Sequence, residues 1–255
     1  MTTNVWLADL THTGQSIASD AIPAAVGMIA EAVEEQCPSV TEIKLFKFPE
    51  DLNQALIESP PHVIGFSNYV WNFNLSQAFG RAIRNRYPEA IIVMGGPNFP
   101  STRAERLSFL LANPWIDFYI EKEGEIPLVK LINFLTDHSE RESNELLDVP
   151  NLCFTKDGSL VQSTNIERLG DLDKIASPYL TGRLDRFLDG SLMPVIQTNR
   201  GCPFSCAFCT EGQGFWNKVK KKSREKIGNE IRYIASALDK LPDGKKRGDL
   251  LIADS

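Results

Sequence analysis

The chain has 255 residues, of which 42% are hydrophobic and 24% charged, a composition typical of a globular protein with one large or two modest domains. Its 27 Lys and Arg against 33 Asp and Glu give a net charge of −6, which argues against a general nucleic-acid-binding surface. Nothing at the amino terminus resembles a signal peptide, and no apolar run is long enough to span a bilayer. We therefore expect a cytoplasmic protein.

The first 135 residues alternate short apolar runs with amphipathic stretches, which predicts a parallel sheet with crossover helices. Five strands are expected, at Val5–Leu10, Glu42–Phe46, Val63–Ser67, Ala90–Met94 and Phe118–Glu121. Helices are expected to begin near Ile22, Asp51, Leu75, Thr102 and Ile126. Asn74 is a candidate N-cap for the third helix. The prediction for residues 1–137 is a flavodoxin-like, doubly wound α/β domain.

A sheet of this kind binds ligands at the carboxyl ends of its strands. The loops expected to converge there are Asp9–Gly14, Ser67–Asn72, Gly95–Pro100 and Glu121–Glu125. The second of these continues an aromatic-rich segment, Phe66–Asn72, which is a candidate cover for a flat ligand, although aromatic residues more often fill a core. This edge is the first candidate functional site.

Residues 138–192 break the alternating pattern. The polar run Ser139–Asn144 indicates an exposed linker, and Asn151–Ser163 is predicted to be a β-hairpin that turns at Asp157-Gly158. From residue 193 the sequence predicts a strand at Val195–Thr198, a helix from about Ser223 to Leu238, and a further strand within 249–255. A basic run at 218–226 precedes the helix and is either a solvated first turn or a site for an anion.

Three cysteines, Cys202, Cys206 and Cys209, follow the first strand of this last segment in a CxxxCxxC pattern. Iron–sulfur clusters ordinarily take four cysteine ligands, so a compact trio suggests a cluster with one iron left for another ligand. Structural zinc is less favoured because no fourth ligand lies nearby, and three close cysteines cannot all pair in disulfides. Cys37 and Cys153 are expected to fill apolar space.

The run from Gln197 to Gly212 resembles the radical S-adenosylmethionine (SAM) superfamily, in which CxxxCxxC holds a 4Fe-4S cluster and the open iron chelates SAM. The resemblance implies that Cys202, Cys206 and Cys209 are the metal ligands and that Phe208 lies near the adenine of SAM. It also implies that residues 193–255 begin a partial (βα)6 barrel. That barrel would be truncated at its second strand, so we expect a fragment of a longer enzyme that is inactive alone.

The loops of residues 1–137 resemble the cobalamin-binding domain that precedes the barrel in one subgroup of this superfamily. The positions that match, and are therefore implied as cobalamin contacts, are Asp9, Thr11, Gly14, Ser67, Gly95, Gly96, Glu123 and Gly124. Each has a plainer explanation as a turn, cap or helix-dipole residue. Within the subgroup's first loop, Thr11 stands where a cobalt-ligating His is found in other cobalamin domains, and His12 is one place off. We therefore expect cobalamin without a histidine ligand.

The resemblance implies reductive cleavage of SAM followed by radical chemistry, most simply methyl transfer to an unactivated carbon. Radical cyclisation, ring rearrangement or epimerisation is the alternative within the family, and a non-catalytic cobalamin- or metal-binding module is the alternative of another class. Expected partners are a small-molecule or peptide substrate and a reductant such as flavodoxin or ferredoxin, with no nucleic acid. The sequence names neither the substrate nor the residues that catalyse the reaction.

Overall fold

The structure is a computed structural model that describes residues 3–14, 19–137, 144–163, 168–209, 212 and 214–254. The chain divides into two compact units. The first unit comprises residues 1–19 and 32–168, and the second comprises residues 20–31 and 169–255. Most of the predicted linker at 139–144 lies outside the described residues. In the described part of the chain, no helix is both long and apolar enough to cross a membrane.

The first unit is built on one seven-stranded sheet in the order β2-β1-β3-β4-β5-β6-β7. The five parallel strands are β1 (Thr3–Ala8), β2 (Val40–Phe46), β3 (Val63–Ser67), β4 (Ile91–Gly95) and β5 (Phe118–Ile120). The helices along this part of the chain are α1 (Ala24–Gln36), α2 (Pro49–Glu58), α3 (Phe73–Arg86), α4 (Arg103–Ala112) and α5 (Glu125–Asp137). The order 2-1-3-4-5 confirms the predicted flavodoxin-like doubly wound fold.

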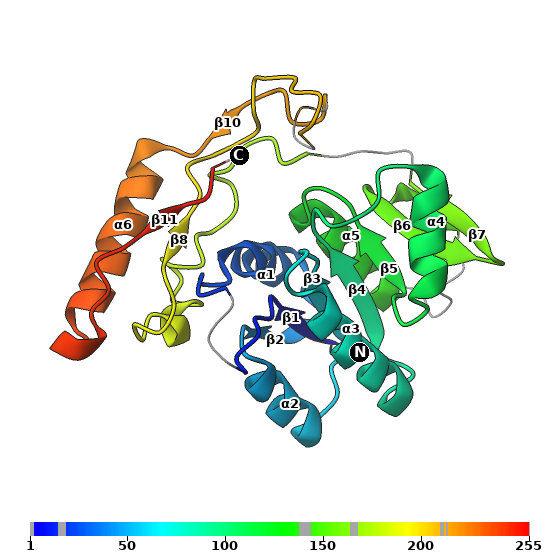
Figure 1. The fold of residues 1–255 in the computed structure, drawn as a ribbon, viewed down its shortest axis with the longest axis horizontal. Coiled ribbons are helices and arrows are strands. Elements are labelled where there is room, and N and C mark those ends of the chain that lie inside the picture. The colour runs from blue at the N-terminus through cyan, green and yellow to red at the C-terminus, as the bar shows by residue number, and fades with distance from the viewer. Residues whose placement is uncertain are drawn as a thin grey trace. The chain divides into compact units, whose positions relative to one another are not determined.

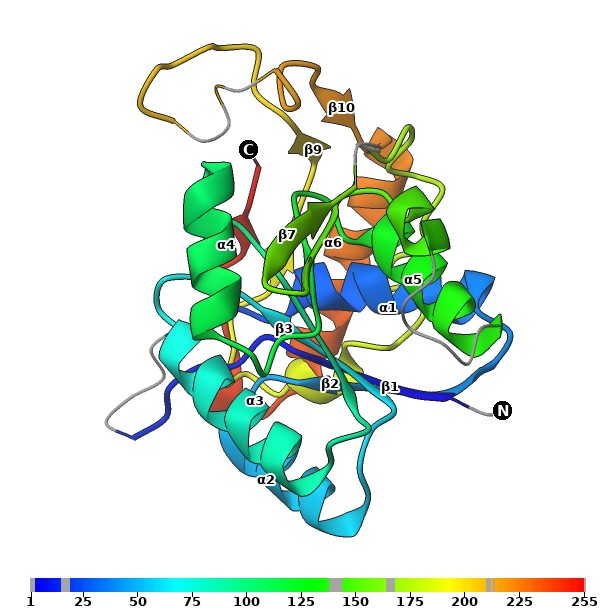
Figure 2. The same ribbon diagram turned by 90° about the vertical axis from the view of Figure 1, so that its right-hand side faces the viewer.

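The core of this unit follows from the alternation of side chains along each strand. On one face Trp6, Ile64 and Ile92 belong to a buried cluster that also contains residues of α2, α3 and α4. On the opposite face lie α5 and the last turn of α1, where Asn133 Nδ2 donates to the Gln36 carbonyl (Figure 2). The central strands β3 and β4 are covered on both faces, which explains why they are nearly continuous apolar runs, whereas the edge strand β2 carries Thr41, Glu42 and Lys44.

The predicted hairpin forms, and its two strands join the sheet. β6 (Leu152–Lys156) pairs antiparallel with β5, and β7 (Ser159–Gln162) pairs with β6. The turn residues Asp157 and Gly158 both have positive φ, 49° and 71°, as a two-residue turn of type I′ requires. A short 3-10 helix, η1 (Asn144–Asp148), precedes β6.

The predicted helix starts are near the observed ones, with three instructive differences. Asn74 is not an N-cap: α3 begins at Phe73 after Asn72, whose side chain makes no cap hydrogen bond. The first helix begins at Ala24, because the Ile22 amide bonds the Met193 carbonyl. Thr102 does cap α4, accepting from the Glu105 amide, so the predicted start there is one residue early.

The second unit contains one βαβ segment (Figure 1). Strands β8 (Val195–Ile196) and β11 (Leu251–Ile252) pair in parallel on either side of α6 (Arg224–Asp239) in the sequence. Between β8 and α6, β9 (Asn199–Arg200) pairs antiparallel with β10 (Lys220–Lys221). Short 3-10 helices lie at η2 (Asp185–Phe187) and η4 (Asp243–Lys245). A parallel pair with a crossover helix is the expected start of a (βα) barrel.

Both strands of this pair are shorter than predicted. The predicted strand Val195–Thr198 stops at Ile196, because the amides of Thr198 and Asn199 donate to the Asp254 carboxylate instead of to a strand. Ser223 is the N-cap of α6 and accepts from the Lys226 amide at 3.1 Å, so the helix begins one residue after its predicted start at about Ser223.

Candidate functional site

The loops that follow β1, β3 and β4 lie together at the carboxyl edge of the first sheet, as predicted. β1 and β4 are the two neighbours of β3, and Ser67 and Gly95 are paired across β3 and β4. The Ser67 hydroxyl donates to Asp9 Oδ1 at 2.6 Å, so residues 58 positions apart in sequence form one polar group. The helices after β1 and β3 leave toward opposite faces, which makes this edge the switch point where doubly wound sheets bind ligands.

The Asp9 carboxylate organises this edge. Lys47, which follows β2, donates from Nζ to Asp9 Oδ2 at 3.0 Å although its own side chain is only 1% exposed. The buried Asn72 donates from Nδ2 to the Ser67 hydroxyl at 2.8 Å and accepts from the Tyr69 amide at 2.8 Å. Sequence reasoning assigned no role to Lys47 or Asn72. Lys47 could have been found by asking which polar residue ends the strand next to β1.

Gly96 is explained by the close approach of two loops. The Asn68 amide donates to the Gly95 carbonyl at 2.6 Å. Gly96 has φ +131°, and a Cβ there would lie 2.6 Å from the Asn68 carbonyl oxygen. The close approach seen in the structure is therefore to the protein's own backbone.

The side chain of Tyr119, on β5, forms hydrogen bonds with both of these loops. Its hydroxyl donates to the Gly96 carbonyl at 2.7 Å and lies 3.1 Å from Asn68 Nδ2. Its ring stacks on Phe99 with centroids 3.7 Å apart. Burial raises the pKa of Tyr119, so the hydroxyl stays protonated and remains a donor.

The first loop is held by the buried side chain of Thr11. Thr11 is buried, and its hydroxyl accepts from the Ser19 amide at 2.8 Å. His12 and Gly14 are exposed. The two Asp9 oxygens are already bonded to Lys47 and Ser67, whereas a ligating imidazole needs a carboxylate or carbonyl partner to orient it.

In the fifth loop, the predicted contact residue Glu123 is paired with a basic side chain. Glu123 is buried and forms an ion pair with Arg168, with Nε and Oε1 3.3 Å apart. Gly124 is half-buried beside it. The predicted roles of Glu123 and Gly124 as ligand contacts thus rest on the family resemblance, and the structure gives Glu123 a role in fixing its own loop.

The loop after β3 carries a stacked aromatic pair, in which Tyr69 is half-buried and Trp71 is exposed. Tyr69 and Trp71 stack with ring centroids 4.5 Å apart and planes 8° apart, and Trp71 is 52% exposed. Burial and the nearby Asp9 carboxylate raise the pKa of Tyr69. Trp71 therefore presents an aromatic surface to solvent, and the aromatic cover of a flat ligand stays a prediction.

The three motif cysteines lie on one loop between β9 and β10. Cys206 and Cys209 are exposed and Cys202 is half-buried. The loop is closed near its base by the Cys202 amide, which donates to the Trp216 carbonyl at 2.9 Å, and Phe208 is 94% exposed. Among the residues the structure describes, no three metal-binding side chains are gathered in one group. The motif is therefore a set of accessible donors on a loop.

The other two cysteines are chemically distinct from this set. Cys37 and Cys153 are buried in the first unit. Burial raises the pKa of Cys37 to about 11. Burial, and then the Glu121 carboxylate that accepts from the Cys153 thiol, raise the pKa of Cys153. Since thiolates are what iron binds, the donor set fits a cluster at Cys202, Cys206 and Cys209.

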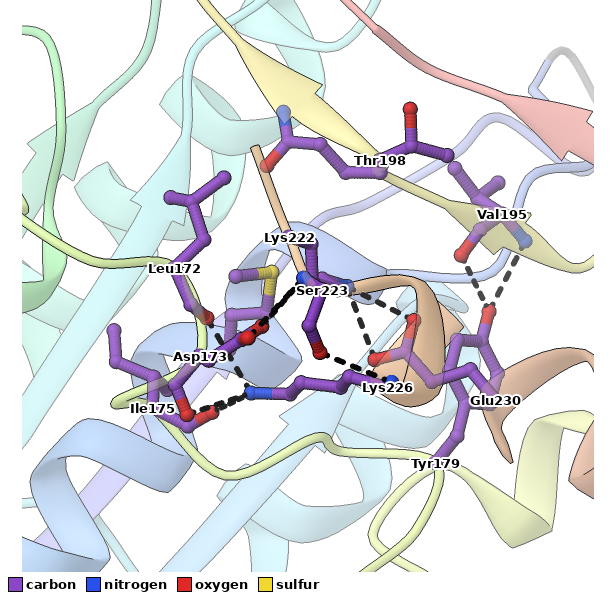
Figure 3. A network of polar contacts seen from close by, with 12 residues as sticks. Leu172, Asp173, Ile175, Tyr179, Val195, Thr198, Lys222, Ser223, Lys226 and Glu230 are labelled. Carbon is purple, nitrogen blue, oxygen red and sulfur yellow. Dashed lines mark hydrogen bonds and ion pairs between the residues drawn. The ribbon is translucent and has the colours of Figure 1, made fainter. Parts of the chain in front are cut away.

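Two side chains of the basic run after this loop are turned inward (Figure 3). Lys222 is buried in an ion pair with Glu230, and Lys226 Nζ donates to the backbone carbonyls of Leu172, Asp173 and Ile175. Burial and the adjacent Lys222 lower the pKa of Lys226. These two lysines are used for structure, which removes them from any anion-binding surface.

These features define a class: a doubly wound α/β domain with polar loops at its carboxyl edge, linked to a βαβ segment with a CxxxCxxC loop. Residues 11–132 match the family model of the B12 binding domain. The first domain thus matches the B12-binding family model, and the comparisons confirm the predicted resemblance to the cobalamin-binding-domain-containing radical SAM family.

Among curated proteins, the chain is 30% identical over 226 residues to 2-(S-pantetheinyl)-carbapenam-3-carboxylate methyltransferase of Streptantibioticus cattleyicolor, covering 84% of this chain and 32% of that protein. It is 29% identical over 193 residues to the cobalamin-dependent radical SAM methyltransferase TokK of Streptomyces tokunonensis, covering 73% and 27%. It is 30% identical over 154 residues to the anaerobic magnesium-protoporphyrin IX monomethyl ester cyclase of Synechocystis, covering 60% and 29%.

Among solved structures, the cobalamin-dependent SAM radical enzyme OxsB, with aqua-cobalamin and SAM bound, matches the whole chain with a TM-score of 0.74 at 16% identity. The match covers 34% of OxsB and shows a shared fold. The chain thus spans about a third of the length of these relatives.

Proposed function

We propose that this protein is a cobalamin-dependent radical SAM enzyme, and that the present chain carries its cobalamin domain and the start of its SAM-cleaving domain. The observation that carries the proposal is the contrast among the five cysteines. Three share one exposed loop in a CxxxCxxC pattern, and two are buried with raised pKa values. That loop follows the segment that matches the B12-binding family model, and the chain is similar to TokK, a cobalamin-dependent radical SAM methyltransferase.

We assign cobalamin to the carboxyl edge of β1, β3 and β4. The exposed face of the Tyr69 and Trp71 pair would contact the corrin, and the loops of Asp9 and Gly95-Gly96 would border it. The Ser67 hydroxyl already donates its proton to Asp9. In this arrangement Ser67 is able to accept a hydrogen bond from the ligand, and Lys47 and Asn72 hold it in that orientation.

We assign a 4Fe-4S cluster to Cys202, Cys206 and Cys209, with Phe208 available to the adenine of SAM. When bound, the reduced cluster supplies the electron that cleaves SAM, and cobalamin supplies the methyl group. The chain's own residues hold these groups and orient them. We infer a small-molecule or peptide substrate, a reductant such as flavodoxin or ferredoxin, and a cytoplasmic location that keeps the three thiols reduced.

Anaerobic reconstitution of the protein with iron and sulfide tests this function. We expect about four irons per chain and formation of 5′-deoxyadenosine from SAM under dithionite with the complete enzyme. Cys206→Ala should abolish both, while Cys37→Ala and Cys153→Ala serve as matched controls and should keep the iron. Equal loss of iron in either control would refute the ligand assignment, and zinc in place of iron and sulfide would favour a non-catalytic module.

Radical cyclisation is a second candidate, favoured by the similarity to the Synechocystis cyclase. The two reactions differ in what the product gains. Methyl transfer adds one carbon that originates from SAM, whereas cyclisation forms a ring without added carbon. Mass spectrometry of the product made with methyl-labelled SAM separates them.

A further inference from the structure

The strand pairing of the loop that carries the three cysteines lies at the base of the loop. β9 and β10 pair there, Arg200 with Lys220 and Asn199 with Lys221. Cys206 and Cys209 lie farther out and are exposed. The position of the thiols is therefore set by the residues that fix the two ends of this short ladder.

Both ends of the loop are tied to Thr198, which lies just before β9. On the entry side, the Thr198 amide donates to Asp254 Oδ1 at 2.6 Å, and the Thr198 hydroxyl donates to Oδ2 of the same carboxylate. On the exit side, the Lys222 amide donates to the Thr198 carbonyl at 2.8 Å. A displacement of Lys222 would thus be transmitted directly to the entry of the loop.

The Lys222 side chain anchors this exit in the interior of the second unit. Its Nζ lies 3.0 Å and 2.9 Å from the two carboxylate oxygens of Glu230, on α6 (Figure 3). The two side chains are 4% and 2% exposed. Lys222 is the first residue after β10, so the ion pair joins the end of the cysteine loop to the helix that follows it.

The helix that carries Glu230 is itself fixed at its start. Lys226 Nζ donates to three backbone carbonyls of the segment 172–175, and the Asp173 carboxylate accepts from the Ser223 amide at 3.0 Å and 3.1 Å (Figure 3). The same connecting segment is linked to β8, because the Tyr179 hydroxyl donates to the Val195 carbonyl and accepts from the Val195 amide. Glu230 therefore offers Lys222 a fixed point of attachment.

A buried ion pair is a poor source of net stability, because removing two charges from water costs about as much as their attraction returns. What such a pair does specify is geometry. The ammonium must contact both carboxylate oxygens, which allows one relative position of the two side chains, whereas apolar contacts allow several. We propose that the Lys222–Glu230 pair is a positioning device that sets the placement of the cysteine loop for cluster assembly. The proposal rests on the proposed function only for the identity of the cluster.

Four variants of the protein test this role. Lys222→Met removes the ammonium, and Lys222→Met with Glu230→Leu replaces the pair by apolar side chains, so that no buried charge is left to unfold the protein. Lys222→Glu with Glu230→Lys restores a pair in reverse. Lys221→Met is the matched control, because it removes one positive charge from the adjacent, exposed position.

The first readout is amide hydrogen exchange in the metal-free protein. We expect the amides of Cys202 and Lys222 to exchange roughly tenfold faster or more in the apolar double variant, with β1 to β5 unchanged. The second readout is the iron and sulfide content after reconstitution, together with the EPR line shape of the reduced cluster. We expect lower loading or an altered line shape in both variants that lack the pair, and recovery in the reversed pair.

The outcomes are separable. If the wild-type protein assembles no iron–sulfur cluster, the proposed function fails, and the exchange measurement still decides whether the pair positions the loop. If the apolar double variant keeps wild-type exchange in the loop base and a wild-type EPR line shape, the positioning role is overturned. A change of equal size in Lys221→Met would reduce the effect to net charge and would also overturn it.

Discussion

Burial separates the five cysteines at the scale of single residues. Cys37 and Cys153 lie inside the first unit, where burial disfavours the thiolate and raises the pKa of each thiol. A raised pKa keeps the thiol protonated at neutral pH, and for Cys37 the reactive thiolate appears only as the pH rises toward about 11.

Alkylation of the native, metal-free protein checks this difference. With iodoacetamide at about pH 8, we expect rapid modification of Cys202, Cys206 and Cys209 and protection of Cys37 and Cys153, with all five modified after unfolding. Mass spectrometry of peptides measures the modified fraction at each site. Modification of Cys37 at the rate of Cys206 would contradict the burial argument.

The second prediction at this scale concerns His12. Both Asp9 oxygens already accept hydrogen bonds, from Lys47 and Ser67, so an imidazole would have to compete with these donors for the carboxylate that orients it. We expect the EPR spectrum of bound cobalt(II) cobalamin to be the same in the wild-type protein and in His12→Ala. Nitrogen superhyperfine splitting that disappears in the variant would show that His12 is a ligand, and base-on cobalamin free in solution provides the reference spectrum.

At the scale of elements, the loop after β4 depends on a glycine. Gly96 combines a φ of +131° with an Asn68 carbonyl oxygen 2.6 Å from any added Cβ. Gly158 has φ +71° with open space around it. A substitution at Gly158 therefore measures backbone strain alone, whereas one at Gly96 measures backbone strain together with steric conflict.

We expect Gly96→Ala to lower the free energy of unfolding by about 3 kcal/mol, since strain and conflict act together. Gly158→Ala should cost about 1 to 2 kcal/mol, from the left-handed backbone alone. Urea unfolding followed by circular dichroism measures both. Equal losses would mean that the Asn68 loop moves away freely and that the close approach is unimportant.

The entry to the cysteine loop depends on one carboxylate of the segment after β11. Asp254 accepts from the amides of Thr198 and Asn199 and from both of their side chains. We expect Asp254→Ala to accelerate amide exchange at Thr198 and Asn199 while the helix α6 stays protected. Asp249→Ala is the control, because its carboxylate bonds Arg247 instead. The same acceleration in the control would exclude a specific role for Asp254.

At the scale of the whole molecule, the two cofactor assignments fall in different units. The Asp9 group lies in the first unit and the cysteine loop in the second. Removing iron with a chelator should therefore alter amide exchange near residues 197–222 and leave β1, β3 and β4 as protected as before. Loss of protection in those strands would show that the cluster stabilises the first domain.

Much of the molecule could be predicted from local patterns. The strand Val63–Ser67 was predicted with its observed bounds, because a buried parallel strand is a continuous apolar run. The hairpin at Asp157-Gly158 was predicted because its turn needs two residues of positive φ. Hydrophobic periodicity indicates that a segment is a strand but not which strand it pairs with. The addition of β6 and β7 to the edge of the sheet was therefore not predicted.

The sequence by itself determined the doubly wound domain, the cysteine trio and the loops at the carboxyl edge, since these depend on apolar periodicity and on short motifs. Tertiary structure alone decided the partners of polar side chains: Lys47 and Asn72 around Asp9, Arg168 for Glu123, and Glu230 for Lys222. It also decided that Asn72 supports Ser67 while α3 begins at Phe73. The physical reason is that a strand or helix is specified by neighbours in sequence, whereas a buried charge or amide must find its partner wherever the fold brings one within hydrogen-bond distance.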